Sequence, residues 1–228
     1  MISVFYLKGT MISLIDADIV CFRVAAASEN DPEDIAILRV DKLMRDVLEA
    51  TQSSEYLAFL TGSNNFRKQI NPEYKAHRKD KPLPKYLGVC REFLVTEWKA
   101  TVSDGCEADD LLGIHQTENS ILCSIDKDLL QIPGKHYNFV KQEFQNVTYE
   151  EGIKFFWKQM LIGDVSDNLF GVAGIGKVKA SKLLDHLTSE EEMQNVVCKL
   201  YNNPDRFQTN ADCFWIWRNE NEQWSDRK

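Results

Sequence analysis

The chain has 228 residues, of which 43% are hydrophobic, and this suits one globular domain with at most a small appended subdomain. No stretch approaches the roughly 20 apolar residues that a membrane span requires, so we expect no membrane partner. The formal net charge of −8 counts at first against a nucleic-acid partner.

The cysteines and the N-terminus indicate the compartment. No two of the six cysteines form a CxxC pair, which argues against a zinc or thioredoxin-type site and suits free thiols in a reducing cytoplasm. The apolar N-terminus lacks a basic n-region and a small-residue cleavage site, so we expect it to belong to the fold. Residues 1–3 and 11–13 both read Met-Ile-Ser, which leaves the start codon open between Met1 and Met11.

Predicted strands and helices alternate along residues 12–125. Short apolar runs predict the strands, and apolar residues at helical spacing predict the helices. Such alternation is typical of a mainly parallel α/β sheet, whose sites lie beyond the carboxyl ends of the strands, where Asp16 and Asp126 fall. The predicted strands cover residues 12–15, 56–60 and 121–125, and the predicted helices cover residues 34–51, 86–97 and 107–116.

The segment from residue 65 to about 86 is polar, basic and interrupted by prolines, so we expect a loop or arch with little core. Eight basic residues and two acids lie between residues 65 and 91. A local basic stripe on an acidic protein is an electrostatic footprint for phosphates, which keeps DNA as a candidate partner. The basic residues are Arg67, Lys68, Lys75, Arg78, Lys79, Lys81, Lys85 and Arg91.

Acidic residues form four groups, each at the boundary of a predicted element. Mg²⁺ prefers oxygen ligands, and two such ions roughly 4 Å apart can hold the attacking water and the leaving oxygen of a phosphodiester. Any one of these groups alone is better explained as a helix cap or a turn than as a metal site. Four such groups in one chain, interleaved with the predicted strands, favour a metal site. The groups are Asp16 with Asp18; Glu107, Asp109 and Asp110; Asp126 and Asp128; and Asp164 and Asp167.

The pattern changes near residue 148, which predicts an α/β core over residues 1–148 and a second region over 149–228. An amphipathic helix at 150–163 precedes a glycine-punctuated turn at 170–177 and a further helix at 178–187. The turn resembles that of a helix–hairpin–helix, in which glycines let the backbone approach phosphates; an ordinary helix C-cap is the alternative. The aromatic tail from residue 210 is expected to pack as a terminal helix.

In this order, the segments resemble the 5′ nuclease superfamily: the 5′–3′ exonuclease domain of bacterial DNA polymerase I, bacteriophage 5′ exonucleases and flap endonucleases. The resemblance runs from about residue 12 to 187 and is closest to the compact phage type. It implies a PIN-like, mainly parallel sheet flanked by helices, with a helical arch and a C-terminal helix–hairpin–helix (helix-three-turn-helix) subdomain. The motifs are LIDAD (14–18), FRKQINPEYKAHR (66–78), EADDLLG (107–113), SIDKDLLQI (124–132) and GDVSDNLFGVAGIGKVKASKLL (163–184).

The resemblance implies a structure-specific 5′–3′ exonuclease or 5′-flap endonuclease that hydrolyses DNA by two-metal catalysis in replication or repair. The expected cofactors are two Mg²⁺ ions, with Mn²⁺ as a substitute, and a K⁺ ion at the hairpin. The expected partners are DNA with a free 5′ end, flap or nick, and a DNA polymerase in trans. We expect a monomer in the cytoplasm of a bacterium or of a phage-infected host.

The resemblance also assigns residues to the metals. The first Mg²⁺ would be held by Asp16, Glu107 and Asp109, with Asp110 alongside. The second would be held by Asp126, Asp128, Asp164 and Asp167. The K⁺ would be held by backbone carbonyls of Leu161, Ile162, Phe170, Val172 and Ile175.

DNA contacts are assigned in the same way. Tyr74, Lys75 and Arg78 match the arch that threads or clamps single-stranded 5′ DNA, where Lys75 and Arg78 would steer the scissile phosphate. Further contacts, made to the DNA backbone without reading sequence, would come from the arch and the hairpin. They are Arg67, Lys68, Lys79, Gly174, Gly176, Lys177 and Lys179.

One stretch departs from the family pattern. The family carries an Asp after its second strand, whereas Phe59-Leu-Thr-Gly-Ser63 holds no acid. The first metal site therefore loses a ligand, for which Asp18 or a water would have to compensate. Two alternatives stay open: a catalytically weakened DNA-structure-binding protein of the same fold, and a metal-dependent RNase, because contacts to the 2′-hydroxyl have no short motif.

Overall fold

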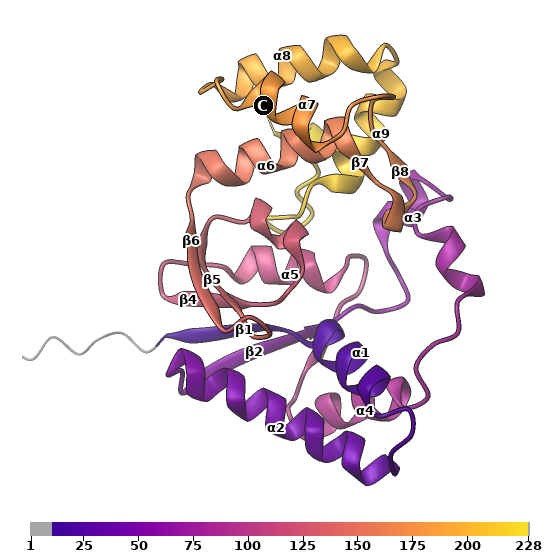
Figure 1. Cartoon of the computed structure of the whole chain (residues 1–228), viewed down its shortest axis with the longest axis vertical. Helices are drawn as coiled ribbons and strands as arrows, with labels where there is room; N and C mark the ends of the chain where they lie inside the picture. The colour runs from indigo at the N-terminus through magenta and orange to yellow at the C-terminus, as the bar shows by residue number, and fades with distance from the viewer. Residues whose placement is uncertain (1–10, 228) are drawn as a thin grey trace, which may run out of the picture.

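A six-stranded sheet forms the centre of the chain in this computed structural model, which describes residues 11–227 (Figure 1). The strand order is β3-β2-β1-β4-β5-β6, and all neighbouring strands are parallel except β5 and β6. This confirms the predicted mainly parallel sheet. The strands are β1 (Ile12–Asp16), β2 (Glu55–Leu60), β3 (Thr101–Val102), β4 (Ser120–Cys123), β5 (Gly134–Asn138) and β6 (Glu143–Val147).

Helices cover both faces of the sheet because neighbouring strand residues point to opposite sides. Ile15 of β1 packs under α1, α2 and α4, whereas the adjacent Leu14 packs with Leu112 of α5 and Leu122 of β4. Strands buried on both faces read as continuous apolar runs, which is why the sequence revealed them. The helices of this part are α1 (Ala17–Ala27), α2 (Glu33–Thr51), α4 (Leu87–Thr96) and α5 (Ala108–His115).

Four helices follow the sheet and share a separate hydrophobic cluster around Phe156, Trp157 and Met160 (top of Figure 1). That cluster also takes in Phe66 and Tyr74 from the basic segment, so the predicted boundary at residue 148 stays a prediction. The tail packs as expected, but its helix ends at Phe214. The helices are α6 (Tyr149–Ile162), α7 (Lys177–Leu184), α8 (Glu190–Tyr201) and α9 (Pro204–Phe214), with a 3₁₀ turn at Trp224–Asp226.

The basic segment differs from the expectation. It contains only a short helix, α3 (Phe66–Ile70), and a 3₁₀ turn, η1 (Ala76–Asp80), instead of a continuous helical arch. It also contributes to the core, because Phe66 is 8% exposed and Tyr74 is 3% exposed. The prediction of little core was therefore wrong, since the two aromatic rings anchor the segment against the C-terminal helices. We keep the name arch for residues 65–86.

A small antiparallel pair, β7 (Gly163–Asp164) and β8 (Leu169–Phe170), brackets the loop that carries Asp167. Gly163 adopts a positive φ of 77°, and a Cβ on it would lie 2.3 Å from the backbone nitrogen of Gly171. Only glycine meets both conditions without strain. The two glycines of the GDVSDNLFG stretch thus allow the end of α6 to touch the following turn.

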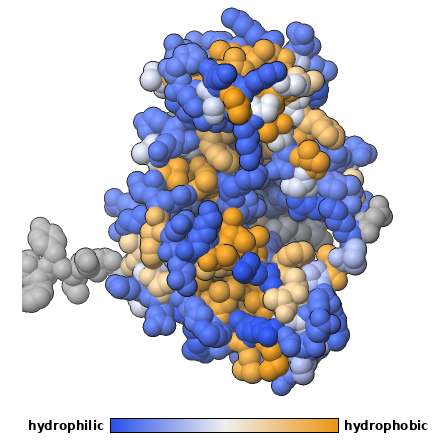
Figure 2. Space-filling model, in the orientation of Figure 1, coloured by the Kyte–Doolittle hydropathy of each residue, from blue (hydrophilic) through white to orange (hydrophobic). Residues whose placement is uncertain are grey.

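No helix among residues 11–227 combines the length and the apolar character needed to cross a membrane. Figure 2 shows hydrophilic side chains over most of the face in view, with apolar patches among them.

Gly163→Ala is expected to lower the free energy of unfolding by on the order of 2 kcal/mol, because the added methyl group meets backbone atoms at a positive φ. Urea denaturation measures this difference. The matched control is Gly88→Ala in α4, where a Cβ meets nothing within 4 Å and alanine should stabilise by about 0.5–1 kcal/mol. Equal stability of wild type and Gly163→Ala would contradict the close approach.

Candidate functional site

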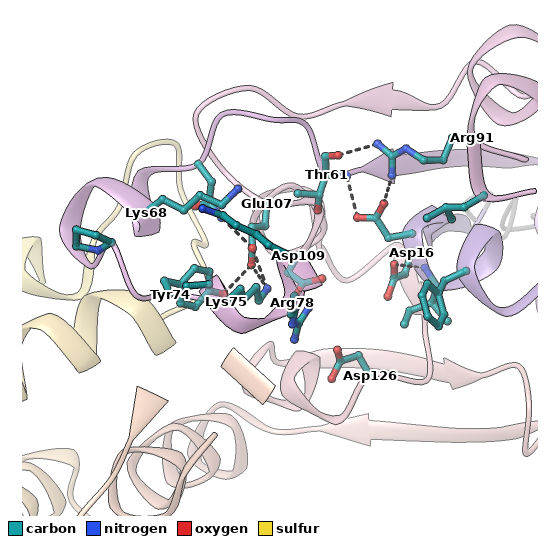
Figure 3. Close-up of a pocket in the computed structure, with 18 residues that line it drawn as sticks. Asp16, Thr61, Lys68, Tyr74, Lys75, Arg78, Arg91, Glu107, Asp109 and Asp126 are labelled. Carbon is teal, nitrogen blue, oxygen red and sulfur yellow. Dashed lines mark hydrogen bonds and ion pairs between the residues drawn. The ribbon is translucent and has the colours of Figure 1, made fainter. Parts of the chain in front are cut away.

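A cavity of about 820 Å³ opens at the carboxyl ends of β1, β2 and β4, where the sequence places the site (Figure 3). One of its walls is the arch, and the opposite wall is formed by α1 and α4. Among the described residues, five carboxylates line the cavity: Asp16, Asp18, Glu107, Asp109 and Asp126.

Three carboxylates on three separate elements form the floor of the cavity. Asp16 ends β1 and caps α1, accepting hydrogen bonds from the Ile19 amide (3.1 Å) and the Ser124 hydroxyl (2.6 Å). Asp109 lies in the first turn of α5, and Asp126 caps the 3₁₀ turn η2 (Lys127–Gln131) after β4. The parallel sheet brings these acids together because their elements begin at one edge.

The floor acids are crowded, and nearby basic groups do not offset that crowding. Burial, with smaller contributions from the carboxylates of Asp18 and Asp126, raises the pKa of Asp16 to about 7. Burial also raises the pKa of Asp109, and the negative charges of Asp16, Asp126 and Glu107 add to the rise. Carboxylates in this state gain from a bound cation, which lowers their pKa and releases protons.

Glu107 is in the opposite electrostatic situation. Burial opposes its ionisation, but the charges of Lys75 and Arg67 hold its pKa down at about 2. Lys75 Nζ contacts both carboxylate oxygens at 2.8 and 2.9 Å, and Tyr74 and Asn65 donate further hydrogen bonds at 3.0 and 2.8 Å. Glu107 therefore already has a cation, supplied by the arch.

The arch is also tied to the loop between β7 and β8. Arg78 contacts Asp167 at 2.7 Å and donates to the Ser166 carbonyl at 2.9 Å. Lys75 adopts a left-handed φ of 55°, and its amide donates to the Asp167 carbonyl at 3.0 Å. The Tyr74 hydroxyl lies 3.0 Å from Glu107 and 3.2 Å from Asp167, so its single proton can be donated to either carboxylate. The three arch residues named from the sequence thus meet acids from both predicted metal sites.

The second group of acids is bridged by a lysine. Lys127 Nζ lies 2.9 Å from Asp128 and 3.1 Å from Asp164. Burial raises the pKa of Asp128 to about 6, with Asp126 adding to the rise. Burial also opposes ionisation of Asp164, but hydrogen bonds from Ser166 and Lys127 leave its pKa below its ordinary value. The ammonium group of Lys127 therefore already lies between two of the four acids assigned to the second metal.

Neither predicted metal site stands assembled. Among residues 11–227, no three Asp, Glu, His or Cys side chains converge closely enough to hold an ion as they are placed. The assignment of individual ligands therefore stays a prediction.

Two predicted roles are contradicted. Arg67, expected to contact DNA, is 2% exposed and makes a bidentate ion pair with Asp110. Asp110, expected near the first metal, is 0% exposed and also accepts from the amides of Glu107 and Trp217 at 2.9 and 3.1 Å. Both side chains already have buried partners within the fold, so neither is available to bind a phosphate or a metal.

The remaining predicted DNA contacts are at the surface. Lys68 and Lys79 line the cavity, and Lys177 is exposed at the start of α7. Lys179 Nζ donates to the Gly174 carbonyl at 2.8 Å, which closes the glycine-punctuated turn. Three of the carbonyls named for K⁺ already accept a hydrogen bond within the chain: those of Leu161, Phe170 and Val172.

Sequence reasoning missed three residues of the site. Ser124, the first residue of the motif SIDKDLLQI, hydrogen-bonds Asp16, and Asn65, which directly precedes the motif FRKQINPEYKAHR, hydrogen-bonds Glu107. Arg91 was counted in the basic stripe but was given no role, although it lines the cavity from α4. No local signal marks it, because its partners lie on α1 and at the end of β2.

Comparisons with known proteins agree with this geometry. The family model described as 5′–3′ exonuclease, N-terminal resolvase-like domain, matches residues 11–157. A 5′–3′ exonuclease of Buchnera aphidicola is 26% identical over 90% of this chain and 80% of its own length. A flap endonuclease of Shewanella sp., Xni, is 28% identical over 70% of this chain and 68% of its own length.

Solved structures of a bacteriophage T5 nuclease have the same fold. One, co-crystallised with metal ions, has a TM-score of 0.70 at 17% identity and covers 87% of both chains. Another, a flap endonuclease complex with DNA and metal ions, has a TM-score of 0.63 at 16% identity and covers 89% of this chain and 90% of its own.

Asp109→Asn and Asp110→Asn are expected to change stability in opposite directions. In EDTA at pH 8, Asp109→Asn should raise the melting temperature by a few degrees, because it removes one of several repelling buried carboxylates. Asp110→Asn should cost about 3 kcal/mol, because it leaves the Arg67 charge buried without its partner.

Calorimetry at several pH values measures both effects. Because the folded-state pKa of Asp16 is raised to about 7, the wild type without metal should gain stability as the pH falls from 8 to 5. A stabilising Asp110→Asn or a destabilising Asp109→Asn would contradict the roles given to these neighbours.

Proposed function

From the premise that this chain belongs to the 5′–3′ exonuclease family, we propose that it is a divalent-metal-dependent, structure-specific 5′ nuclease acting on DNA. One observation carries the proposal. Asp16, Asp109 and Asp126 line the floor of one cavity from three elements, under a wall that supplies Lys68, Lys75, Arg78 and Lys79. Within the described part of the chain, the floor acids have no paired basic group and are suited to bind a metal ion, and the basic groups of the arch wall are suited to bind a phosphate.

The donor set fits Mg²⁺, with Mn²⁺ as a substitute. The floor offers carboxylate oxygens, and no histidine or cysteine lines the cavity among the described residues. Asp16, Glu107 and Asp109 would hold the first ion, and Asp126, Asp128, Asp164 and Asp167 would hold the second. Bound ions would supply a water-derived nucleophile and neutralise the charge on the leaving oxygen. The raised pKa values of Asp16, Asp109 and Asp128 support this assignment.

Lys75 and Arg78 change partner in this proposal. Each now neutralises an acid assigned to a metal: Lys75 pairs with Glu107, and Arg78 pairs with Asp167. With those acids engaged as metal ligands, Lys75 and Arg78 would be free to contact a phosphate entering the cavity. Tyr74 contacts the same two acids and ties the arch to the start of α5 and to the loop between β7 and β8.

The substrate is DNA with a free 5′ end, a flap or a nick. Support comes from the relatives, which include 5′–3′ exonucleases and flap endonucleases, and from a T5 neighbour solved with DNA. Helix α7, with Lys177 and Lys179 exposed in its first turn and Lys182 exposed in its last turn, is suited to contact the phosphates of the duplex without reading bases. A K⁺ ion at the preceding turn, a monomeric state, a polymerase acting in trans and a role in replication or repair complete the proposal.

A second candidate has a structural motive. The stretch Phe59–Ser63 holds no acid where the family carries one, and the Thr61 hydroxyl within it accepts from the Ala108 amide at 3.0 Å. This stretch supplies no carboxylate to the first metal. A DNA-structure-binding protein with weakened turnover is therefore the alternative.

Cleavage of a labelled 5′-flap DNA tests the proposal. Wild type should cut in Mg²⁺ and not in EDTA, and Asp126→Ala should be slower by about a thousandfold or more while still binding the flap. The control is Asp205→Ala at the start of α9, an exposed acid that does not line the cavity. Binding without any cleavage in Mg²⁺ or Mn²⁺ would favour the weakened alternative, and preferential cleavage of an RNA flap would identify an RNase.

Lys75→Met should lower kcat by about a hundredfold, because a positive group beside the reacting phosphate is lost. Lys81→Met serves as the control, since Lys81 is exposed in the same segment and does not line the cavity. Single-turnover cleavage separates this step from binding. Equal single-turnover rates for Lys75→Met and Lys81→Met would remove Lys75 from the reaction.

A further inference from the structure

The wall of the cavity opposite the arch holds a basic side chain that the proposed mechanism does not use. Five basic residues line the cavity among the described residues, and four of them belong to the arch. The fifth is Arg91, on α4. Figure 3 shows Arg91 and Lys75 on opposite sides, with Asp16, Asp109 and Asp126 between them.

Two segments hold the guanidinium of Arg91 in place. One terminal nitrogen is paired with the Asp18 carboxylate on α1, and the other donates to the Thr61 carbonyl at 2.7 Å, just after β2. The second oxygen of Asp18 accepts from the Thr61 amide at 2.8 Å, which closes the ring of contacts. The position of the guanidinium is thus set before any ligand arrives.

Arg91 nevertheless keeps free hydrogen-bonding capacity. A guanidinium has five N–H donors, and only two of those of Arg91 have acceptors in the described part of the chain. Its side chain is 30% exposed. Its neighbours along this wall, Ile19, Phe22 and Leu87, carry no side-chain acceptor that could take up the others.

Arg67 shows what a purely structural arginine looks like in the same protein. Its side chain is 2% exposed, and it donates to both oxygens of Asp110 and to the carbonyls of Cys213 and Trp215. Arg91 has half as many acceptors and faces a cavity. A merely structural tie between α1 and α4 would need neither the exposure nor the open donors.

We propose that Arg91 binds a second phosphate of the DNA strand, on the far side of the carboxylate floor from Lys75 and Arg78, with Asp18 as its positioning residue. The inference rests on the proposed nuclease function. A guanidinium binds phosphate through two parallel N–H donors, and an acid that orients it sharpens that geometry. The DNA strand would then cross the carboxylate floor with one phosphate bound by Arg91 and another bound by Lys75 and Arg78. These two contacts would set the direction of the strand over the reacting centre.

The phosphate has two possible sources that share this chemistry: an internal phosphodiester and the terminal phosphate of a 5′ end. Matched oligonucleotides with a 5′-phosphate or a 5′-hydroxyl distinguish them. Loss of affinity on both would assign Arg91 to an internal phosphate. Loss confined to the phosphorylated strand would assign it to the terminus.

The experiment measures binding of a fluorescent nicked duplex in EDTA, where cleavage cannot interfere. Arg91→Gln should raise Kd about tenfold and reduce the slope of log Kd against log salt by about one. Arg91→Lys keeps the charge but loses the paired donors, so it should keep the salt slope and recover only part of the affinity. The matched control is Arg23→Gln, which removes an exposed positive charge from α1 outside the cavity.

Asp18→Asn tests the positioning role, since asparagine can still accept from Thr61 but no longer pairs as an ion with Arg91. It should weaken binding in the wild-type background and have no effect in Arg91→Gln. Tighter binding by Asp18→Asn would mean that Asp18 merely repels DNA, and would overturn its role. In Mg²⁺, Arg91→Gln should raise KM more than it lowers kcat.

Equal Kd values for Arg91→Gln and Arg23→Gln, with both variants folded by circular dichroism, would overturn the inference. That failure is distinct from failure of the proposed function, in which the wild type itself would neither bind the nicked duplex nor cut it in Mg²⁺.

Discussion

The buried ion pair between Arg67 and Asp110 is the contact on which the rest of the site depends. It joins the start of the arch to α5, and through the carbonyls of Cys213 and Trp215 it joins both to the end of α9. Removing one partner would leave a buried charge, so these segments hold together or fail together. Glu107 and Asp109 precede Asp110 at the start of α5, and Tyr74 follows Arg67 along the arch. The side chains assigned to metal and phosphate are therefore placed by an ion pair that does not line the cavity.

That anchoring allows the neighbouring acids to remain crowded. Burial and mutual repulsion raise the pKa values of Asp16 and Asp109 on the floor, which disfavours the metal-free fold at neutral pH. Lys75, Arg78 and Lys127 relieve the same repulsion around Glu107, Asp167, Asp128 and Asp164. Without metal, the chain thus has two electrostatic regions. Among residues 11–227, the floor acids have no basic side chain paired with them, whereas the acids around the arch and Lys127 do.

The sequence predicted the parallel sheet and the presence of acids at its carboxyl edge, because buried strands and the carboxylates that follow them are local patterns. It could not show that Asp109 lines the cavity whereas Asp110 is buried against Arg67. Two adjacent residues of one helical turn differ in this respect only through the side chains that lie opposite them in the fold. Arg67 was assigned to DNA because composition shows charge and not burial, and its partners are up to 148 residues away. The Asp18, Thr61 and Arg91 ring was hidden for the same reason. The β5–β6 hairpin was missed because β6 is mostly exposed and has little apolar signal.

The uneven placement of charge has a consequence before any contact is made. A chain of net charge −8 repels a polyanion from most directions, whereas the arch concentrates positive charge beside one opening. The attraction reaches only about one Debye length, roughly 8 Å at physiological ionic strength. Encounters at other faces are short, and those at the arch are prolonged. Approach is thus filtered by orientation, so that a strand reaches the cavity already turned toward it.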